Sequence, residues 1–409
     1  MSFKHRSILD TIPGYKQGKP APAKPGQRTF KLSSNENAFE PLPSVAEAIT
    51  SQATGRMNRY PDMRGWAVVE RLAERYGVEA ENVMLGCGST EVITMLVNLV
   101  AGPGDEIVYP WRSFEAYPLI VAGAGATSVQ VPNLPDGSHD VDGLIAAVND
   151  RTRLVIVNNP NNPTSTSISD ADARRIMQAV PSDVLVLFDE AYIQFNTAAD
   201  TSVAMDLFRE YPNVVVAHTF SKAYGLAGLR IGYAIAPADV VEGMSKVALP
   251  FGVTETAQVA AVASLDAQEE LDERVRAIIA ERDRVVTALR EQGWEFPTPY
   301  ANYFWLPLGE PGRPRPRSRS RACRPVCSPA RASASPSASP RPTIWSSRSA
   351  RSSRLRGCEP TRRGRRSARA GGCSGPRNPP ARHAEYAGCD TLKPMFRKGH
   401  YSKGFVWCD

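Results

Sequence analysis

The chain has 409 residues, of which 42% are hydrophobic and 22% charged, and its formal net charge is +7 at pH 7. This length suggests two or three domains, and the composition is that of a globular protein rather than a fibrous or disordered one. No apolar run approaches the ~20 residues that span a bilayer, and the N-terminal segment lacks the apolar core of a signal peptide, so we expect a cytoplasmic protein.

The charge is unevenly distributed along the chain. Residues 311–409 contain 20 Arg, 3 Lys and 4 acidic residues, a net charge of +19, which leaves −12 on the first 310 residues. Six of the seven cysteines also lie in 311–409, and Cys87 stands alone before them. We therefore expect no disulfide framework in the first 310 residues. The spacing of the other cysteines, even with His383 and His400 nearby, fits unpaired thiols better than a zinc site, so we predict no metal.

In chain order, residues 1–30 are rich in Pro, Gly and Lys, and we expect an extended arm there. From Arg56 onward, short apolar runs alternate with amphipathic stretches, which predicts a mostly parallel sheet covered by helices. We expect a helix over 89–102, with Ser89 as its N-cap and Gly102 near its end, and another over 170–180. The expected strands cover 82–88, 105–110, 126–132, 153–160, 183–192, 213–220 and 231–237.

The pattern changes again toward the end of the chain. Residues 255–293 have apolar residues at helical spacing and are long enough for two helices, and 294–308 is expected to form strands that begin a smaller domain. After Gly309 neither periodicity continues, and the Arg, Ser, Pro and Ala composition predicts a disordered tail over 311–409.

Polar residues gather just after the expected strands, where open α/β sheets bind ligands. "GCGSTE" (86–91) lies at a strand-to-helix junction whose free N–H groups favour a phosphate. It matches neither the dinucleotide nor the P-loop pattern, and by itself it fits a simple capped turn better. "NNPNNPTS" (158–165) holds four asparagines in a loop made rigid by two prolines, although a surface turn is an equally good interpretation.

Two further stretches place a charged side chain directly after an apolar strand. Asp189 in "FDEAY" follows "VLVLF", so its carboxylate requires a partner, which could be a cationic ring nitrogen or a structural arginine. Lys222 in "TFSKAYGLAGLR" has the setting of a Schiff-base nucleophile, and Arg230 with Thr219 and Ser221 could bind a phosphate. Together the four stretches predict a ligand with a phosphate, a basic aromatic nitrogen and a carbonyl, which describes pyridoxal 5′-phosphate.

The segments "NPNNPTS", "DEAY" and "TFSKAYGLAGLRIGY", with "SSNENAF" and "RYPD" earlier in the chain, resemble the fold-type I pyridoxal-phosphate aminotransferases, over about Ile12 to Leu308. The similar subgroup contains histidinol-phosphate aminotransferase and the bacterial aromatic amino acid aminotransferases. "WRSFEAYP" and "LPFGVTETAQVAA" are more similar to the actinobacterial aromatic enzymes. The resemblance implies an α/β fold of type I and ping-pong transfer of an amino group between an aromatic L-amino acid and a 2-oxo acid.

The resemblance also implies a division into parts. These are an arm (1–30), the N-terminal part of a small domain (31–55), a large cofactor-binding domain (56–250), an incomplete small α+β domain (251–310) and an out-of-family basic tail (311–409).

The resemblance implies roles for the matching residues. Lys222 would hold the cofactor as a Schiff base and then move the substrate's α-proton, Asp189 would pair with the pyridine nitrogen, and Asn162 and Tyr192 would contact the phenolic oxygen. Trp111 would stack on the ring, and Asn35 would lie near the substrate. The phosphate would be bound by Ser89, Thr90, Thr219, Ser221, Arg230 and, from a neighbouring subunit of a homodimer, Tyr60.

The sequence departs from the family at two places. Ser165 replaces the glycine of the family's "NPTG", a mild change. More seriously, the family's small domain continues past "ANYFWLPLG" (301–309) to a strand with an arginine that binds the substrate's α-carboxylate, and we find no such strand in 311–409. We therefore expect cofactor binding to survive better than transamination, in a chain that is prone to aggregate.

Three alternatives remain open from the sequence. Histidinol-phosphate aminotransferase is the alternative within the same subgroup. The tail, with its charge of +19, could bind nucleic acid nonspecifically, although it has few aromatic residues for base stacking. A nicotinamide-dependent dehydrogenase on a similar sheet is disfavoured by the missing glycine fingerprint and by the setting of Lys222.

The composition of the tail predicts a frameshift near Glu310, because a GC-rich gene read out of register yields Arg, Pro, Ala, Ser, Gly and Cys. Translating the gene in its two other frames beyond this codon is expected to restore alternating strands and helices. If neither frame does so, the hypothesis is wrong.

Overall fold

The structure is a computed structural model that describes residues 4, 6–10, 12, 14, 15, 26, 34–306 and 402–404. The predicted arm falls largely outside these residues, and so does the tail, with its six cysteines, except for 402–404. The predicted disorder and nucleic-acid binding of the tail therefore stay predictions, as do the domain boundaries. Among the described residues, no helix has the length and apolar character that crossing a membrane requires.

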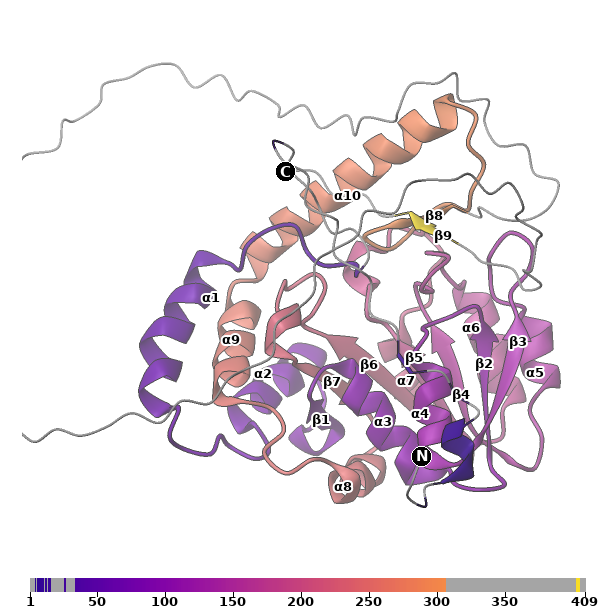
Figure 1. Cartoon of the computed structure of the whole chain (residues 1–409), viewed down its shortest axis with the longest axis horizontal. Helices are drawn as coiled ribbons and strands as arrows, with labels where there is room; N and C mark the ends of the chain where they lie inside the picture. The colour runs from indigo at the N-terminus through magenta and orange to yellow at the C-terminus, as the bar shows by residue number, and fades with distance from the viewer. Residues whose placement is uncertain are drawn as a thin grey trace, which may run out of the picture. The chain divides into compact units, whose positions relative to one another are not determined.

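A seven-stranded sheet forms the centre of the described chain, with the strand order β1-β7-β6-β5-β4-β2-β3 (Figure 1). Strands β3, β2, β4, β5 and β6 run parallel, whereas β7 is antiparallel to both β6 and β1. The predicted mostly parallel sheet is thus confirmed. The strands are β1 (Val83–Gly86), β2 (Glu106–Trp111), β3 (Thr127–Pro132), β4 (Thr152–Asn158), β5 (Leu185–Asp189), β6 (Val214–Thr219) and β7 (Gly232–Ile235).

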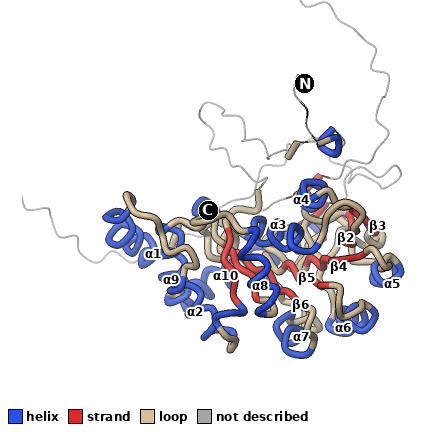
Figure 2. Tube along the Cα trace, turned by 90° about the horizontal axis from the view of Figure 1, so that it is seen from below, coloured by secondary structure: helices blue, strands red, loops and turns tan. Residues whose placement is uncertain are grey.

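Helices cover both faces of the sheet, above and below the strands in Figure 2. The central strands are apolar on both sides because alternate residues enter different cores: Val186 and Phe188 pack with one set of helices, and Leu187 packs with the other. One face carries α2 (Trp66–Tyr76), α5 (Val141–Ala146), α6 (Asp170–Ala179) and α7 (Ala204–Glu210), and the other carries α3 (Ser89–Val100), α4 (Tyr117–Ala124) and α8 (Ala238–Val247).

Helix α3 differs from its prediction at its N-terminus. Its N-cap is Gly88 rather than Ser89, which is the first helical residue, whereas its C-cap is Ala101, next to Gly102, which was predicted to lie near the end of the helix. Gly88 has a φ of 81°, which is costly for a residue with a side chain. The turn into the helix is therefore made by glycine, and the N–H groups of the first turn stay free of a side-chain cap.

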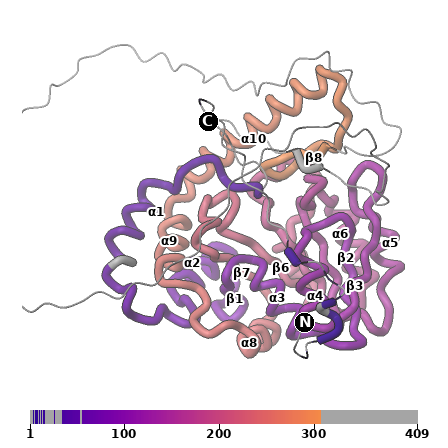
Figure 3. Tube along the Cα trace, viewed as in Figure 1, coloured from indigo at the N-terminus to yellow at the C-terminus, as the bar shows by residue number. Residues whose placement is uncertain are grey.

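Two helical segments that are far apart in the sequence pack against each other beside the sheet. Helix α1 (Pro43–Ala48) lies along α9 (Glu255–Asp266), and α10 (Gln268–Glu291) follows after a break at Ala267 (Figure 3). The two predicted helices are thus confirmed.

The prediction of strands over 294–308 is largely wrong for the residues that the structure describes, 294–306. Pro297 and Pro299 leave 294–303 without a regular element, and only β8 (Phe304–Leu306) forms. It pairs with β9 (Ser402–Gly404), a strand that the sequence did not predict.

Candidate active site

The expected ligand-binding residues meet where β4, β5 and β6 end. These strands are adjacent and parallel, and they end at Asn158, Asp189 and Thr219. Because the carboxyl ends of parallel strands lie at one edge of a sheet, the loop that contains Asn162, the turn that contains Tyr192 and the segment that contains Lys222 all begin at this edge.

Asp189 is the buried acid of the site, with 3% of its surface exposed. Its Oδ2 accepts a hydrogen bond from the hydroxyl of Tyr117 at 2.6 Å, whereas its Oδ1 is buried and has no hydrogen-bond partner among the residues that the structure describes. Burial raises the pKa of Asp189 to about 6, although Tyr117 and the backbone N–H of Ala191 partly oppose the shift. The carboxylate therefore offers one oxygen to a cationic partner.

Three residues that the sequence analysis did not single out hold this region in place. Asn158 donates from Nδ2 to the carbonyl of Asp189 at 2.9 Å and accepts at Oδ1 from the backbone N–H of Asn162 at 2.8 Å. His139 Nε2 donates to the carbonyl of Asn158 at 3.0 Å, and burial lowers the pKa of His139 to about 4, so its ring is neutral at pH 7. Tyr117 is the third. Asn158 and Tyr117 lie within segments that carry the site prediction or the resemblance, "NNPNNPTS" and "WRSFEAYP", but no local pattern marked His139.

Lys222 and Tyr192 come together with Asn35, as predicted for a shared site. Lys222 Nζ donates to the carbonyl oxygens of Ser34 at 3.1 Å and Asn35 at 3.2 Å, and it lies 5.4 Å from the centre of the Tyr192 ring. Asn35 donates from Nδ2 to the hydroxyl oxygen of Tyr192 at 3.0 Å. Burial raises the pKa of Tyr192, so this hydroxyl keeps its proton. The buried Asn35, with a φ of 53°, therefore links the lysine and the phenol.

Arg230 lies beside the N-terminus of α3. Its Nη2 donates to the carbonyl of Cys87 at 3.4 Å, and its Nη1 donates to Ser221 Oγ at 3.5 Å. A Cβ at Gly88 would lie 2.4 Å from Arg230 Nη2, and one at Gly232 would lie 2.3 Å from the backbone nitrogen of Ser89. These glycines therefore permit the close approach of a guanidinium, a hydroxyl and free helix N–H groups, which suits a phosphate.

The remaining predicted residues have the following places. Thr219 Oγ1 accepts from the backbone N–H of Ser221 at 3.0 Å, and Thr90 is the second residue of α3. Trp111 is the half-buried last residue of β2, with the guanidinium of Arg112 5.6 Å from its ring centre. Tyr60 is 79% exposed in the single chain, and its ring stacks on Phe251.

The residues fit pyridoxal 5′-phosphate. An unpartnered buried carboxylate oxygen suits a protonated ring nitrogen, the Arg230 and α3 region suits the phosphate, and Lys222 provides an amine for the aldehyde. Tyr192 and Asn162 are the hydrogen-bonding groups expected for the phenolic oxygen.

Comparison with known proteins leads to one family. The model of aminotransferase class I and II matches residues 27–322. The chain is 52% identical over 309 residues to an aromatic amino acid aminotransferase of Streptomyces avermitilis, covering 76% of this chain and 86% of the relative. It is 47% identical over 310 residues to one of Cutibacterium acnes, covering 76% and 87%.

A solved structure of similar fold is that of histidinol-phosphate aminotransferase from Sinorhizobium meliloti in complex with pyridoxal-5′-phosphate. It is 31% identical to this chain, with a TM-score of 0.64, and the match covers 68% of this chain and 76% of that one.

The raised pKa of Asp189 predicts that this residue destabilises the cofactor-free chain at neutral pH. Its pKa rises from 3.8 in the unfolded chain to about 6 in the folded one. The folded chain therefore has its full stability below pH 4, where Asp189 is protonated, and loses stability as the pH rises through 6 and the carboxyl ionises. Asp189→Asn is expected to raise the free energy of unfolding at pH 7.5 by at most about 3 kcal/mol, at about 1.4 kcal/mol per pKa unit. Urea unfolding at several pH values measures this gain, which should vanish near pH 4.

Asp183→Asn removes an exposed carboxylate just before the same strand and serves as the control. A gain for Asp189→Asn that is the same at pH 4 and pH 7.5 would show that burial of the charge is not its cause.

Proposed function

This chain belongs to the class I and II aminotransferases, and on that basis we propose a role for each residue of the site in the reaction. It is a pyridoxal-phosphate-dependent aminotransferase of fold type I, which transfers an amino group between an amino acid and a 2-oxo acid. Aromatic L-amino acids are the amino donors, in line with the relatives named aromatic amino acid aminotransferase at about half identity. The observation that best supports the site is the unpartnered buried oxygen of Asp189 in the same site as Lys222.

The bound cofactor supplies an electron sink for the negative charge that develops at the substrate's α-carbon. Lys222 would hold the cofactor through Nζ and would then take and return the α-proton of the substrate. The low-dielectric surroundings of Asp189 strengthen its attraction for a cationic ring nitrogen and keep a proton on that nitrogen. Tyr192 retains its own proton for donation because burial raises the pKa of its hydroxyl, whose oxygen accepts a hydrogen bond from Asn35.

The residues around the N-terminus of α3 and Arg230 would hold the phosphate of the cofactor. Ser89 and Thr90 open α3, and Thr219 and Ser221 begin the segment that carries Lys222. A phosphate bound by Arg230 and Ser221 is therefore fixed to the same segment as the reactive lysine, which limits the movement of the cofactor between steps. Trp111, at the end of β2, would cover the ring face.

We propose that the chain forms a homodimer in which Tyr60 contributes to the partner's phosphate site. Tyr60, Met63, Leu249 and Phe251 are large apolar residues with 41–79% of their surface exposed. Met63 and Leu249 also line a cavity of about 250 Å³. A group of exposed apolar side chains beside a cavity is typical of an interaction surface. The cytoplasmic location stays a prediction from the sequence.

Lys222 is expected to form the covalent link to the cofactor. An absorbance band of lysine-bound cofactor should appear when pyridoxal phosphate is added to the chain, and borohydride should fix the mass increment on Lys222. Lys222→Ala should abolish both signals, whereas Lys246→Ala, which removes an exposed lysine paired with Glu242, should change neither. Attachment that persists in Lys222→Ala would contradict the assignment.

The same spectrum tests the substrate. If the carboxylate-binding arginine is missing, as the sequence predicts, the band persists when phenylalanine is added. Bleaching by phenylalanine would show that the altered C-terminus is tolerated. Bleaching by histidinol phosphate in preference to phenylalanine would favour the alternative donor.

The exposed apolar side chains predict the oligomeric state. Met63→Glu combined with Leu249→Glu places two charges on the proposed interface and should convert a dimer into monomers in sedimentation velocity runs. Leu134→Glu, at an apolar residue that is 44% exposed elsewhere, is the matched control and should remain dimeric. A wild-type chain that sediments as a monomer at all concentrations would refute the proposed dimer.

A further inference from the structure

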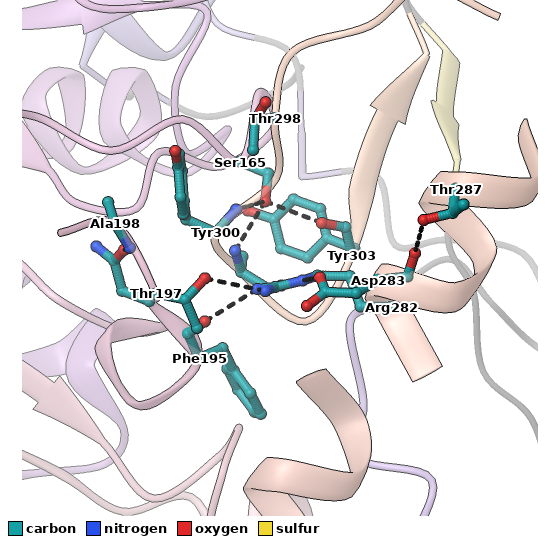
Figure 4. A network of polar contacts seen from close by, with 12 residues as sticks. Ser165, Phe195, Thr197, Ala198, Arg282, Asp283, Thr287, Thr298, Tyr300 and Tyr303 are labelled. Atoms are coloured by element: carbon teal, nitrogen blue, oxygen red, sulfur yellow. Dashed lines mark hydrogen bonds and ion pairs between the residues drawn. The ribbon is translucent and has the colours of Figure 1, made fainter. Parts of the chain in front are cut away.

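The hydroxyl of Ser165 in the asparagine loop makes two hydrogen bonds to the turn formed by residues 300–303 (Figure 4). Ser165 Oγ accepts from the backbone N–H of Ala301 at 2.8 Å and donates to the carbonyl of Tyr303 at 2.9 Å. The carbonyl of Ser165 accepts from the N–H of Tyr300 at 2.7 Å. Ser165 is fully buried with a φ of 62°, so glycine would suit the backbone there but would lack the hydroxyl.

Other contacts fix the same turn from both sides. Arg282 in α10, which is 5% exposed, donates from Nη1 to the carbonyl of Ala301 at 3.2 Å. Tyr303 donates its hydroxyl to the carbonyl of Asn161 at 3.1 Å, and its ring meets that of Tyr192 edge to face with centres 5.2 Å apart. The turn therefore has a defined position against the residues of the site.

Asn302, at the centre of this turn, extends into the hydrogen-bonded group around Lys222. Its Nδ2 donates to the carbonyl of Asn35 at 3.5 Å, and the same oxygen accepts from Lys222 Nζ at 3.2 Å. The amide and the ammonium thus share one acceptor. Asn302 is 2% exposed, and its Oδ1 is buried with no hydrogen-bond partner in the described part of the chain.

A buried acceptor without a donor costs free energy, so such an atom in a folded chain requires an explanation, and a ligand that supplies the donor is one. Asp189 Oδ1 is such an atom, and the cofactor accounts for it. Asn302 Oδ1 requires a different donor, because it is grouped with the lysine nitrogen and Asn35. The substrate's amino group would have to reach the carbon of the cofactor that Lys222 would hold, which brings it toward Lys222 Nζ and Asn302.

We propose that Asn302 is a further substrate-binding residue, whose Oδ1 accepts a hydrogen bond from the incoming amino group, and that Ser165 is the positioning residue that holds it there. This inference rests on the proposed aminotransferase function. It concerns the first complex with the amine, before any bond to the cofactor changes. Asn302 should therefore act on the affinity of that complex more than on the rate of the step that follows.

The test uses 2-phenylethylamine, which has an amino group but no carboxylate and so does not depend on a carboxylate-binding arginine. The rate at which the amine changes the absorbance of the cofactor-loaded chain is measured against amine concentration, which separates the dissociation constant of the first complex from the limiting rate. Asn302→Leu, of similar volume, is expected to raise the dissociation constant about tenfold and to leave the limiting rate nearly unchanged. Asn302→Asp keeps an acceptor oxygen and should bind the amine at least as tightly as wild type.

Ser165→Gly tests the positioning role without adding strain. It should raise the dissociation constant less than Asn302→Leu does, and the amide hydrogens of Tyr300 and Ala301 should exchange faster by mass spectrometry, independently of any turnover. Thr287→Ala is the matched control, because it removes an exposed hydroxyl of α10 bonded to the carbonyl of Asp283. It should change neither quantity.

Wild-type affinity in Asn302→Leu, or an Asn302→Asp chain as weak as Asn302→Leu, would overturn the inference while leaving the aminotransferase function intact. A wild-type chain that attaches no cofactor at Lys222 would overturn the proposed function, and this inference with it. The two failures are distinguishable because cofactor attachment is read before any amine is added.

Discussion

The buried carboxylate of Asp189 is the constraint on which the site depends. A charge at the end of a central strand is unfavourable unless it is paired, yet Tyr117 satisfies only one of its oxygens. The surrounding residues keep the group buried rather than neutralise it: Asn158 binds its backbone carbonyl, and His139 holds Asn158. A cationic ligand completes the pairing, so binding of the cofactor also stabilises the folded chain.

A second dependence runs through Asn35, which joins parts of the chain that are far apart in sequence. Its backbone carbonyl accepts from Lys222 and Asn302, and its side chain donates to Tyr192. The reactive lysine is therefore placed by the segment before α1 as well as by the end of β6. Asn302 lies in the segment after α10. The carbonyl oxygen of Asn35 therefore helps to position both Lys222, which we propose holds the cofactor, and Asn302, which we propose binds the substrate.

Much of the fold follows from the sequence because its central strands are continuous apolar runs, and such runs are buried on both faces. The positions of Asp189, Lys222 and Asn162 were predictable for a related reason. Asp189 ends the apolar run of β5, and Lys222 and Asn162 lie in the segments just after β6 and β4, at the edge of the sheet where ligands bind. Prediction was poorer for the start of one helix and for the segment after α10. Gly88 rather than Ser89 caps α3, and prolines suppress most of the strands expected after Trp294.

The sequence by itself determined the order of strands and helices, the polar residues that end the central strands and the family they resemble, because these depend on local spacing and residue type. Only the tertiary structure decided that Tyr117 holds Asp189, that Asn35 links Lys222 to Tyr192, and that Ser165 fastens the turn carrying Asn302. These contacts join residues 72 to 187 positions apart. Their geometry is set by how helices and loops pack across the sheet, which no local pattern encodes.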